Sequence, residues 1–351
     1  MTASAPAAGV RASVRLTGRC DNACCFCAQH GTAVGDRDDG RSQLDAARRD
    51  GADEVSFVGG EPLLVDTLIP AIVHARALGF VAIGVQTNGV ALAERAVLDR
   101  LRDAGLTDVH LSIHGAQAAI HDYHVGRPGA FVAVTAALAN LRTRGVRTVV
   151  TSVLTRSNAR AMGELPTWLV AHAVAGWSVA LPHAAGRAAA AFDRVMPRLA
   201  LTLPFVLHAL DRARKLGLPV GMTDAPACLL GPWIAESRIE QSRSFAPVCD
   251  GCDARPRCAG VDAAYLARFG GDELRPRARA DAGALSMSAA LRRCFVGVGE
   301  RIELEIPRHE PAAAARRRLP LLERPAPGRD ENRTRPQNAA PLFPALTDEE
   351  P

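Results

Sequence analysis

Short apolar runs alternate with amphipathic stretches through the first two thirds of the chain. Six runs of strand length, rich in β-branched residues, lie at residues 13–16, 54–58, 81–86, 109–113, 148–154 and 178–181. Between them, apolar residues recur at helical spacing and predict helices at residues 44–49, 64–78, 91–103, 131–144 and 162–173. In the third helix Leu98 and Leu101 share one face, and Asp99 and Arg102 lie opposite. Such a helix covers a sheet with its apolar side.

A glycine precedes each later run at the point where a helix is expected to end. These glycines are Gly51, Gly79, Gly105, Gly145, Gly176 and Gly217. Strands and helices that alternate at this spacing form parallel sheets with right-handed crossovers. The sequence therefore predicts an α/β fold over residues 12–220, a partial (β/α)6 TIM-like barrel, with an open doubly wound sheet as the alternative.

The alternation stops near residue 220. Residues 221–276 are irregular and cysteine-rich, which predicts a small C-terminal module. Residues 277–351 are rich in Ala, Arg and Pro, with nine prolines from Pro307 to Pro351, and predict a largely disordered tail with one short strand at 301–306. Residues 1–11 are expected to be disordered as well.

Charge and composition narrow the function classes. The chain has a formal charge of +5. Its arginines form no basic stripe interleaved with aromatic residues, so nucleic acid binding is not indicated. The N-terminus lacks the apolar core of a signal peptide, and the most apolar window, residues 168–181, is too short to span a bilayer. Eight of the nine cysteines fall into two groups, which suits metal sites in a reducing compartment, so we expect a cytoplasmic protein without a membrane partner.

The first cysteine group lies in the sequence CDNACCFC at residues 20–27. Cys20, Cys24 and Cys27 are close enough in sequence to converge on one soft-metal cluster. A cubane 4Fe-4S cluster has four irons, so one iron would have no protein ligand and could bind a small molecule. Zinc is the alternative, although structural zinc sites favour paired C-x2-C units. We interpret Cys25 as a spare thiol and expect no disulfide within this turn.

Polar and glycine-rich segments follow the first four predicted strands, at residues 20–27, 59–62, 87–89 and 112–115. The carboxyl ends of parallel strands meet at one mouth of a barrel, where active sites form. The sequence therefore predicts one active site built from all four segments. Each segment taken alone is also compatible with an ordinary turn.

The cysteine spacing, the aromatic Phe26 and the segment Gly59-Gly60-Glu61-Pro62 together resemble the radical S-adenosylmethionine (radical SAM) superfamily. The resemblance implies a 4Fe-4S cluster on Cys20, Cys24 and Cys27 that binds SAM and cleaves it reductively to a 5'-deoxyadenosyl radical. That radical takes a hydrogen atom from the substrate. The resemblance further implies contacts to the cofactor from the residues Phe26, Gly59, Gly60, Glu61, Pro62, Asn88, Ser112 and His114.

For the glycine pair and for Glu61, the expected cofactor contacts also have a physical basis. Glycines let the backbone approach a ligand closely, and the Glu61 carboxylate could balance the ammonium group of SAM. His114 stands where many relatives carry Asp, which leaves its partner open among ribose, substrate and solvent. His121 and His124 follow at once, and we interpret them as the rim of a loop rather than a second metal site.

The second cysteine group is Cys228, Cys249, Cys252 and Cys258. Four thiolates can bind zinc tetrahedrally or complete an iron-sulfur cluster. The resemblance favours an auxiliary 4Fe-4S cluster in a SPASM or twitch-like module, although a full SPASM module has more cysteines. The remaining Cys294 is expected not to bind metal.

The resemblance also implies the partners. The expected substrate is a peptide that receives a crosslink or side-chain oxidation, and a small molecule is the alternative. A one-electron donor such as a flavodoxin or a ferredoxin is expected. A non-catalytic iron-sulfur or zinc protein is the remaining alternative, which the three-cysteine loop disfavours because a structural site gains from a fourth ligand.

Overall fold

The computed structural model describes residues 11–31, 40–231, 233, 237–239 and 243–276. Its centre is one parallel sheet in which the strands follow one another in chain order from β1 to β8. The strands are β1 (Arg11–Thr17), β2 (Glu54–Gly59), β3 (Ala82–Thr87), β4 (Asp108–Ser112), β5 (Arg147–Val153), β6 (Gly176–Ala180), β7 (Val220–Thr223) and β8 (Ser237–Arg238). Sequential parallel order is the pattern of a (β/α) barrel, and β1 does not pair with β8, so the barrel is partial.

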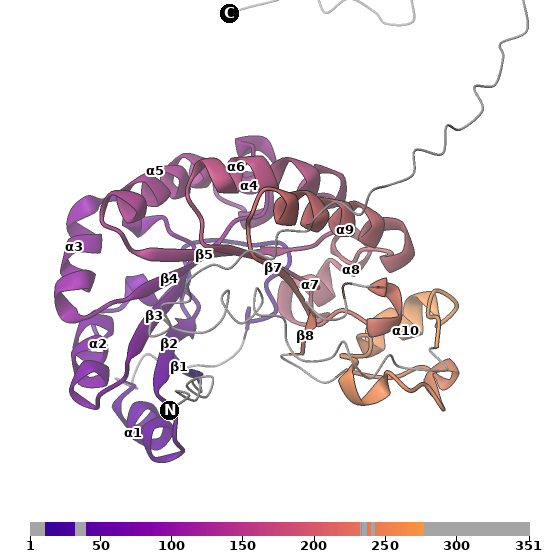
Figure 1. Cartoon of the computed structure of the whole chain (residues 1–351), viewed down its shortest axis with the longest axis horizontal. Helices are drawn as coiled ribbons and strands as arrows, with labels where there is room; N and C mark the ends of the chain where they lie inside the picture. The colour runs from indigo at the N-terminus through magenta and orange to yellow at the C-terminus, as the bar shows by residue number, and fades with distance from the viewer. Residues whose placement is uncertain (1–10, 32–39, 232, 234–236, 240–242, 277–351) are drawn as a thin grey trace, which may run out of the picture. The chain divides into compact units, whose positions relative to one another are not determined.

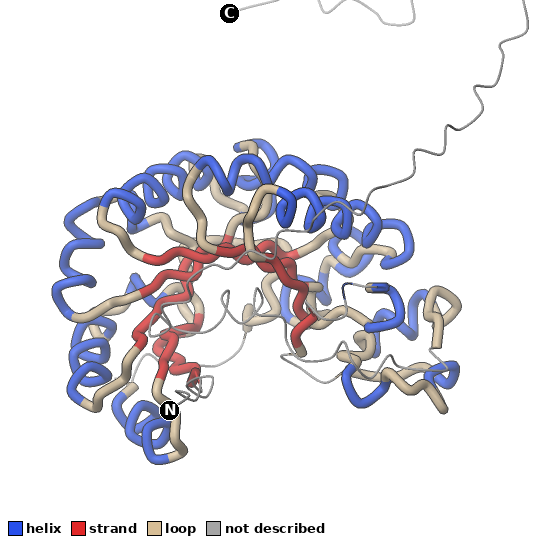
Figure 2. The backbone as a smooth tube through the Cα atoms, in the orientation of Figure 1, coloured by secondary structure: helices blue, strands red, loops and turns tan. Residues whose placement is uncertain are grey.

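Helices connect the strands and lie outside the curved sheet (Figures 1 and 2). They are α1 (Arg41–Arg49), α2 (Leu68–Ala77), α3 (Arg95–Ala104), α4 (Ala118–Val125), α5 (Ala130–Thr143), α6 (Leu165–Ala171), α7 (Gly186–Ala190), α8 (Phe192–Val195) and α9 (Leu199–Lys215). Short 3-10 turns add η1 (Pro62–Leu64), η2 (Ala91–Ala93) and η3 (Ala159–Glu164). Leu98 and Leu101 of α3 are buried, as the amphipathic pattern predicts.

After β7 the described residues form only short elements, and we call residues 226–276 the cysteine module. It contains η4 (Ala227–Leu229), η6 (Pro247–Cys249), η7 (Arg255–Arg257) and α10 (Ala263–Phe269). One antiparallel bridge joins Ser244 to Val261. Such a short segment with so little regular structure gains little stability from its own backbone.

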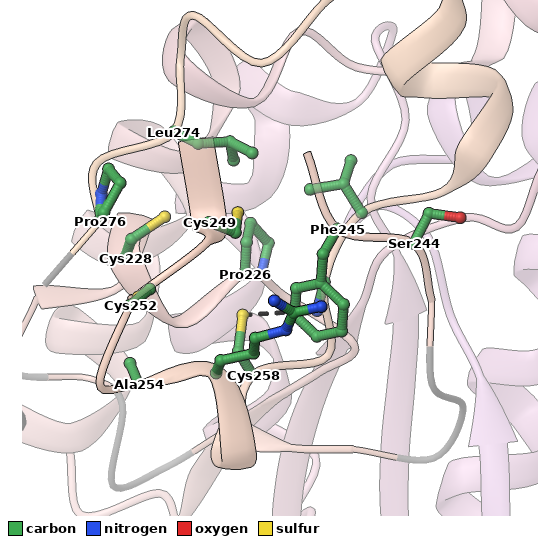
Figure 3. Close-up of a pocket in the computed structure, with 13 residues that line it drawn as sticks. Pro226, Cys228, Ser244, Phe245, Cys249, Cys252, Ala254, Cys258, Leu274 and Pro276 are labelled. Atoms are coloured by element: carbon green, nitrogen blue, oxygen red, sulfur yellow. Dashed lines mark hydrogen bonds between the residues drawn. The ribbon is translucent and has the colours of Figure 1, made fainter. Parts of the chain in front are cut away.

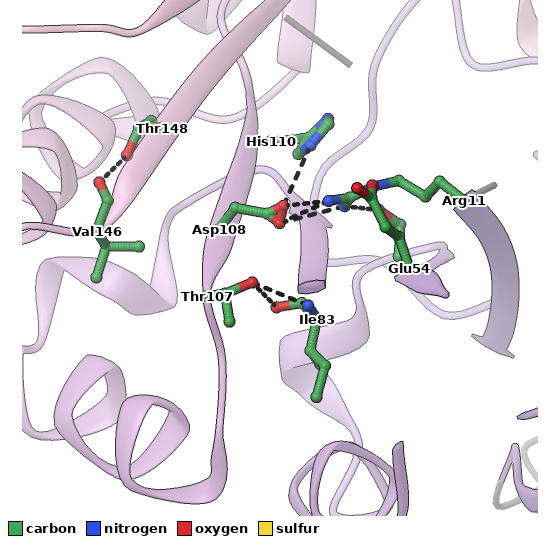
Figure 4. A network of polar contacts seen from close by, with 9 residues as sticks. Arg11, Glu54, Ile83, Thr107, Asp108, His110, Val146 and Thr148 are labelled. Atoms are coloured by element: carbon green, nitrogen blue, oxygen red, sulfur yellow. Dashed lines mark hydrogen bonds and ion pairs between the residues drawn. The ribbon is translucent and has the colours of Figure 1, made fainter. Parts of the chain in front are cut away.

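A polar network closes the amino-terminal ends of the strands (Figure 4). Arg11 begins β1, and its guanidinium donates to Glu54 Oε2 at 2.8 Å and to Asp108 Oδ1 at 2.7 Å. Both carboxylates are buried and need this cation. A Cβ on Gly84 would lie 2.5 Å from Asp108 Oδ2, so the network also requires a glycine on β3. This end of the barrel is filled, which leaves the carboxyl ends for chemistry.

The predicted fold class is confirmed, and two parts of the prediction need correction. The sheet continues past residue 220 through β7 and β8, so it has more strands than the six predicted. The residues of the predicted loop rim, His121 and His124, lie in helix α4 instead. The tail, the 301–306 strand, Cys294 and residues 1–10 lie outside the described residues. No helix in the described ranges is long and apolar enough to cross a membrane.

Candidate active site and metal centres

The loop after β1, residues 18–31, crosses the carboxyl ends of the strands and is fixed from two sides. On one side Ala23 N donates to Val125 O at 2.8 Å and Cys25 N donates to His124 O at 3.0 Å, both at the end of α4. On the other side Arg187 N of α7 donates to Cys27 O at 2.9 Å. We call this segment the cysteine loop. Its backbone is positioned by the barrel, so its thiols are held in place by the fold.

Cys20, Cys24 and Cys27 are close enough to affect one another. Burial, followed by the charges of Cys20 and Cys27, raises the pKa of Cys24 to about 12. Cys20 is exposed as a residue, but the partial burial of its thiol also raises its pKa. Such thiols become thiolates when a bound cation compensates their charge, which is what an iron cluster does. The donor set therefore fits a 4Fe-4S cluster with three protein ligands.

The arrangement differs from a site for a single ion. Within the described ranges, no group of three or more His, Cys, Asp or Glu side chains is arranged to hold one metal ion. In a cubane each thiolate binds a different iron, so the sulfurs lie further apart than around one zinc ion. Cys25 is half-buried and free, and burial raises its pKa while the charge of Arg194 acts in the opposite direction.

The Gly59-Gly60 pair meets the cysteine loop directly. Gly60 N donates to Thr17 O at 2.8 Å, and Glu61 N donates to Arg19 O at 2.7 Å. A Cβ on Gly60 would lie 2.0 Å from Arg19 O, and one on Gly59, at φ +145°, would lie 2.3 Å from Thr17 O. The close approach that requires these glycines is therefore between two backbone segments of the protein itself. Pro62 follows as the buried first residue of η1.

Glu61 is buried and ties three segments together. Its Oε1 accepts from Thr87 Oγ1 at 2.7 Å and from Leu63 N at 3.1 Å, and its Oε2 accepts from Asn88 N at 2.7 Å. Burial raises its pKa to about 7, and the three donors act in the opposite direction. Each carboxylate oxygen has two acceptor sites, so Oε2 retains one beyond these bonds.

Asn88 joins the third strand end to the cysteine loop. Its Nδ2 donates to Asp21 Oδ1 at 2.7 Å, and its Oδ1 accepts from Val90 N at 2.9 Å. Asp21 also pairs with Arg127 beyond α4. The sequence analysis did not identify Asp21. Its position directly after Cys20 could have indicated that it lies at the site. Ser112 ends β4, is half-buried, and has no hydroxyl partner among the described residues.

His114 is buried beside the aromatic ring of the cysteine loop. The ring of Phe26 meets it edge-on at a centroid distance of 4.5 Å, and His121 stacks on it at 5.9 Å. Its Nδ1 accepts from Val153 N at 3.1 Å, which places the ring proton on Nε2. Burial lowers the pKa of His114 well below its ordinary value, so the imidazole is neutral. This ring is therefore a neutral donor at the mouth.

His124 is a structural side chain. Its Nδ1 contacts Ile120 O at 2.6 Å, and its Nε2 contacts Thr155 Oγ1 at 2.8 Å and Ser157 Oγ at 2.9 Å. These contacts join α4 to the segment after β5. His121 Nδ1 accepts from His114 N at 3.3 Å.

The second cysteine group lines one pocket (Figure 3). Cys228, Cys249, Cys252 and Cys258 all contribute to its wall. Burial, followed by the charges of the other three thiols, raises the pKa of Cys228. Cys258 Sγ accepts from Ala227 N at 3.3 Å and from Gly260 N at 3.4 Å, as metal-bound thiolates commonly do. The four residues supply enough thiolates for a complete iron-sulfur cluster, and like the cysteine loop they are not arranged around a single metal ion.

Arg243 connects the cysteine module to the barrel. Its guanidinium approaches Leu181 O at 3.3 Å and His183 Nε2 at 3.3 Å, beside Asp224 Oδ2 at 3.7 Å. Asp262 adds a second connection, because its Oδ2 accepts from Ala184 N at 3.0 Å. The sequence analysis missed the contact between Arg243 and His183, since no local pattern connects residues 60 positions apart.

The sheet and the cysteine loop define an α/β partial barrel with a thiol-rich mouth. Comparison with known families agrees: residues 14–164 match the model of the Radical SAM superfamily. The matched range includes the cysteine loop and the segments around Glu61, Asn88 and His114. The cysteine module lies outside the matched range.

Two curated relatives are similar over part of their length. A PqqA peptide cyclase of Xanthomonas campestris pv. campestris (strain B100) is 34% identical over 151 residues, which are 42% of this chain and 40% of the relative. A probable GTP 3',8-cyclase of Methanothermobacter marburgensis is 32% identical over 103 residues, 28% of this chain and 33% of the relative. The chain thus spans less than half the length of these relatives.

Solved structures share the fold at low identity. SuiB of Streptococcus suis, bound to the precursor peptide SuiA, aligns with a TM-score of 0.51 and 16% identity over 63% of this chain and 50% of SuiB. The FeFe-hydrogenase maturase HydG of Carboxydothermus hydrogenoformans aligns with a TM-score of 0.51 and 13% identity over 68% of this chain and 59% of HydG. At such identities the likeness concerns the fold alone.

Proposed function

We propose that this protein is a radical SAM enzyme that reductively cleaves S-adenosylmethionine and takes a hydrogen atom from a peptide substrate. The observation that carries the proposal is the cysteine loop. Three interacting thiols lie at the mouth of a parallel barrel, and the segment that bears Glu61 is bonded to the same loop. A three-thiolate cluster leaves one iron available to a small molecule.

When bound, the cluster and SAM supply one-electron cleavage of the sulfonium and a 5'-deoxyadenosyl radical. The protein binds and orients these groups. Cys20, Cys24 and Cys27 supply the thiolates, and Glu61 offers its remaining acceptor site to an ammonium group. Ser112 offers a hydroxyl to a polar group of SAM.

The side chains around the proposed SAM site shield it from water and keep His114 neutral. Phe26 covers one side of His114, and the neutral imidazole keeps its proton on Nε2. A neutral donor can bind the oxygen atoms of a ribose or a carboxylate without acidifying the site. Gly59, Gly60 and Pro62 keep the β2 segment against the cysteine loop, and Asn88 adds a second tie.

A peptide is the substrate that the comparisons support best. The named activity of the 34% identical relative is peptide cyclisation, and SuiB shares the fold and was solved with a precursor peptide. Crosslinking or side-chain oxidation of a peptide fits both. A small-molecule substrate is the second candidate, and it is supported by the 32% identical probable GTP 3',8-cyclase. Both candidates use the same cysteine loop.

The second cysteine group is proposed to hold an auxiliary 4Fe-4S cluster, with zinc as the alternative. Its four thiols surround one pocket and need no external ligand. An auxiliary cluster could bind the substrate or accept an electron from the product radical. Metal analysis of the purified chain distinguishes iron with sulfide from zinc.

The decisive experiment is anaerobic reconstitution followed by addition of dithionite and SAM. We expect 5'-deoxyadenosine from the wild-type protein and from Cys25→Ala, and none from Cys24→Ala. Absence of 5'-deoxyadenosine from reconstituted wild type would favour a non-catalytic metal protein. Mass spectrometry of a peptide encoded beside the gene then tests the substrate, since an unchanged mass in a turnover that produces 5'-deoxyadenosine counts against the peptide.

A further inference from the structure

A cavity lies against the cysteine loop and is not used by the site described above. Its volume is about 370 Å³. It is lined by Ala23, Cys25, Tyr123, Arg187, Ala190, Ala191 and Arg194. We call it the loop pocket. Cys25 belongs to its lining, whereas Cys20, Cys24 and Cys27 do not.

The loop pocket is positively charged. Arg187 and Arg194 are its only charged lining residues. Among the described residues neither side chain has a hydrogen bond or an ion pair to an acidic side chain, while nearby Asp193 pairs with Arg268 and Asp21 with Arg127. Two unpaired guanidinium groups at one concave surface attract carboxylates and raise association rates with acidic partners.

The pocket is rigidly connected to the cysteine loop. Arg187 N donates to Cys27 O, and a Cβ on Gly186, at φ +52°, would lie 2.6 Å from the same oxygen. On the opposite wall, Tyr123 belongs to α4, whose last turn accepts from Ala23 N and Cys25 N. A partner seated here contacts the chain one residue away from Cys24.

We propose that the loop pocket docks the acidic surface of a one-electron carrier protein. The inference rests on the proposed function, which requires one electron from outside in each reductive cleavage. The carrier loses one electron at its own cofactor, and the enzyme gains it. The pocket places a positive surface beside the loop whose thiols hold the electron acceptor. Charges of this kind govern the association rate and its salt dependence more than they govern the final affinity.

The test uses a double variant with reversed charge and a matched control. Arg187→Glu with Arg194→Glu changes the pocket, and Arg100→Glu with Arg142→Glu makes the same change in net charge on the outer helices α3 and α5. Arg100 and Arg142 also have no side-chain partner among the described residues. Flavodoxin is the probe, and its binding to the reconstituted full-length chain is measured at low and at high salt. At low salt we expect the pocket variant to bind about tenfold more weakly and the control to bind within about twofold of wild type.

A second readout separates docking from catalysis. The pocket variant should form 5'-deoxyadenosine at the wild-type rate with dithionite and about tenfold more slowly with reduced flavodoxin. Equal loss in the pocket and control variants would overturn the proposal, as would unchanged flavodoxin binding by the pocket variant. If a Glu-rich peptide binds the pocket while flavodoxin does not, the pocket is a site for an acidic peptide and the carrier proposal is wrong. Failure of the proposed function appears separately, as absence of dithionite-driven product from wild type.

Discussion

The two cysteine groups are held in place by different parts of the chain. The cysteine loop is bonded to Glu61, α4 and α7 by backbone contacts that span long stretches of sequence, such as Arg187 N to Cys27 O. Around the second group the backbone contacts stay within the cysteine module, as from Cys252 N to Cys249 O and from Ser244 N to Val261 O. The barrel therefore positions an incomplete ligand set, whereas the complete set must order its own surroundings. Metal binding and folding are coupled in sites of the second kind.

The largest expected effect comes from removing the three thiols of the cysteine loop. The Cys20, Cys24 and Cys27 triple Ala variant should form no 5'-deoxyadenosine, because no cluster remains to bind SAM. If the second group binds a 4Fe-4S cluster, about four of about eight irons per chain should remain. Iron and sulfide analysis checks this number. Loss of all metal from this variant would show that the two groups are not independent.

Removing the second group should damage structure more than SAM cleavage. With Cys228, Cys249, Cys252 and Cys258 changed to Ala, amide hydrogen exchange should increase across residues 243–276, because their stability depends on the bound metal. Exchange in β2 to β4 should stay unchanged. Hydrogen exchange followed by mass spectrometry measures both regions. Equal protection in the variant and the wild type would mean that the module orders itself without metal.

Gly60→Ala tests whether the barrel alone positions the cysteine loop. Its Cβ would lie 2.0 Å from Arg19 O, so the loop or β2 must shift. We expect a loss of about 1–3 kcal/mol in the free energy of unfolding, measured by urea denaturation. The matched control is Gly163→Ala, where nothing lies within 4 Å of the added Cβ. A Gly60 variant as stable as the Gly163 variant would contradict the close contact.

The smallest effect is expected far from both cysteine groups, at the Asp99–Arg144 ion pair between α3 and α5. The bond to Arg144 lowers the pKa of Asp99 below its ordinary value near 3.8. The pair therefore stabilises the protein above that pH, and the stabilisation disappears as the pH falls through the lowered pKa. Asp99→Asn should lower the melting temperature slightly at neutral pH and not at about pH 2. Calorimetry at both values checks the sign, and a larger loss at acidic pH would contradict it.

The sequence predicted the six strands from β1 to β6 to within two residues, because each contains a short run rich in apolar and β-branched residues, and the runs in β2 to β6 also follow a glycine. It missed β7, although Gly217 precedes it, since Val220–Thr223 contains a glycine and no continuous β-branched run. Helix α9 was missed because Pro204 lies inside it, and α4 because its histidines obscure the apolar pattern. The residues of the candidate site belong to local motifs, so the sequence could name them as candidates. The contacts of Asp21 and Arg243 depend on the folded chain and could not be found in this way.

Gly59 and Gly60 pack closely on the backbone of Thr17 and Arg19. This packing affects how active and inactive relatives of this chain can be told apart from their sequences. These glycines are required by the architecture, so a descendant that had lost its chemistry would still need them. Cys20 carries no such constraint, because its side chain is exposed and packs little. In a lineage drifting toward inactivity the thiol would disappear first and the glycine pair would persist. In a survey of genomes, the cysteines are therefore the better marker of a working enzyme.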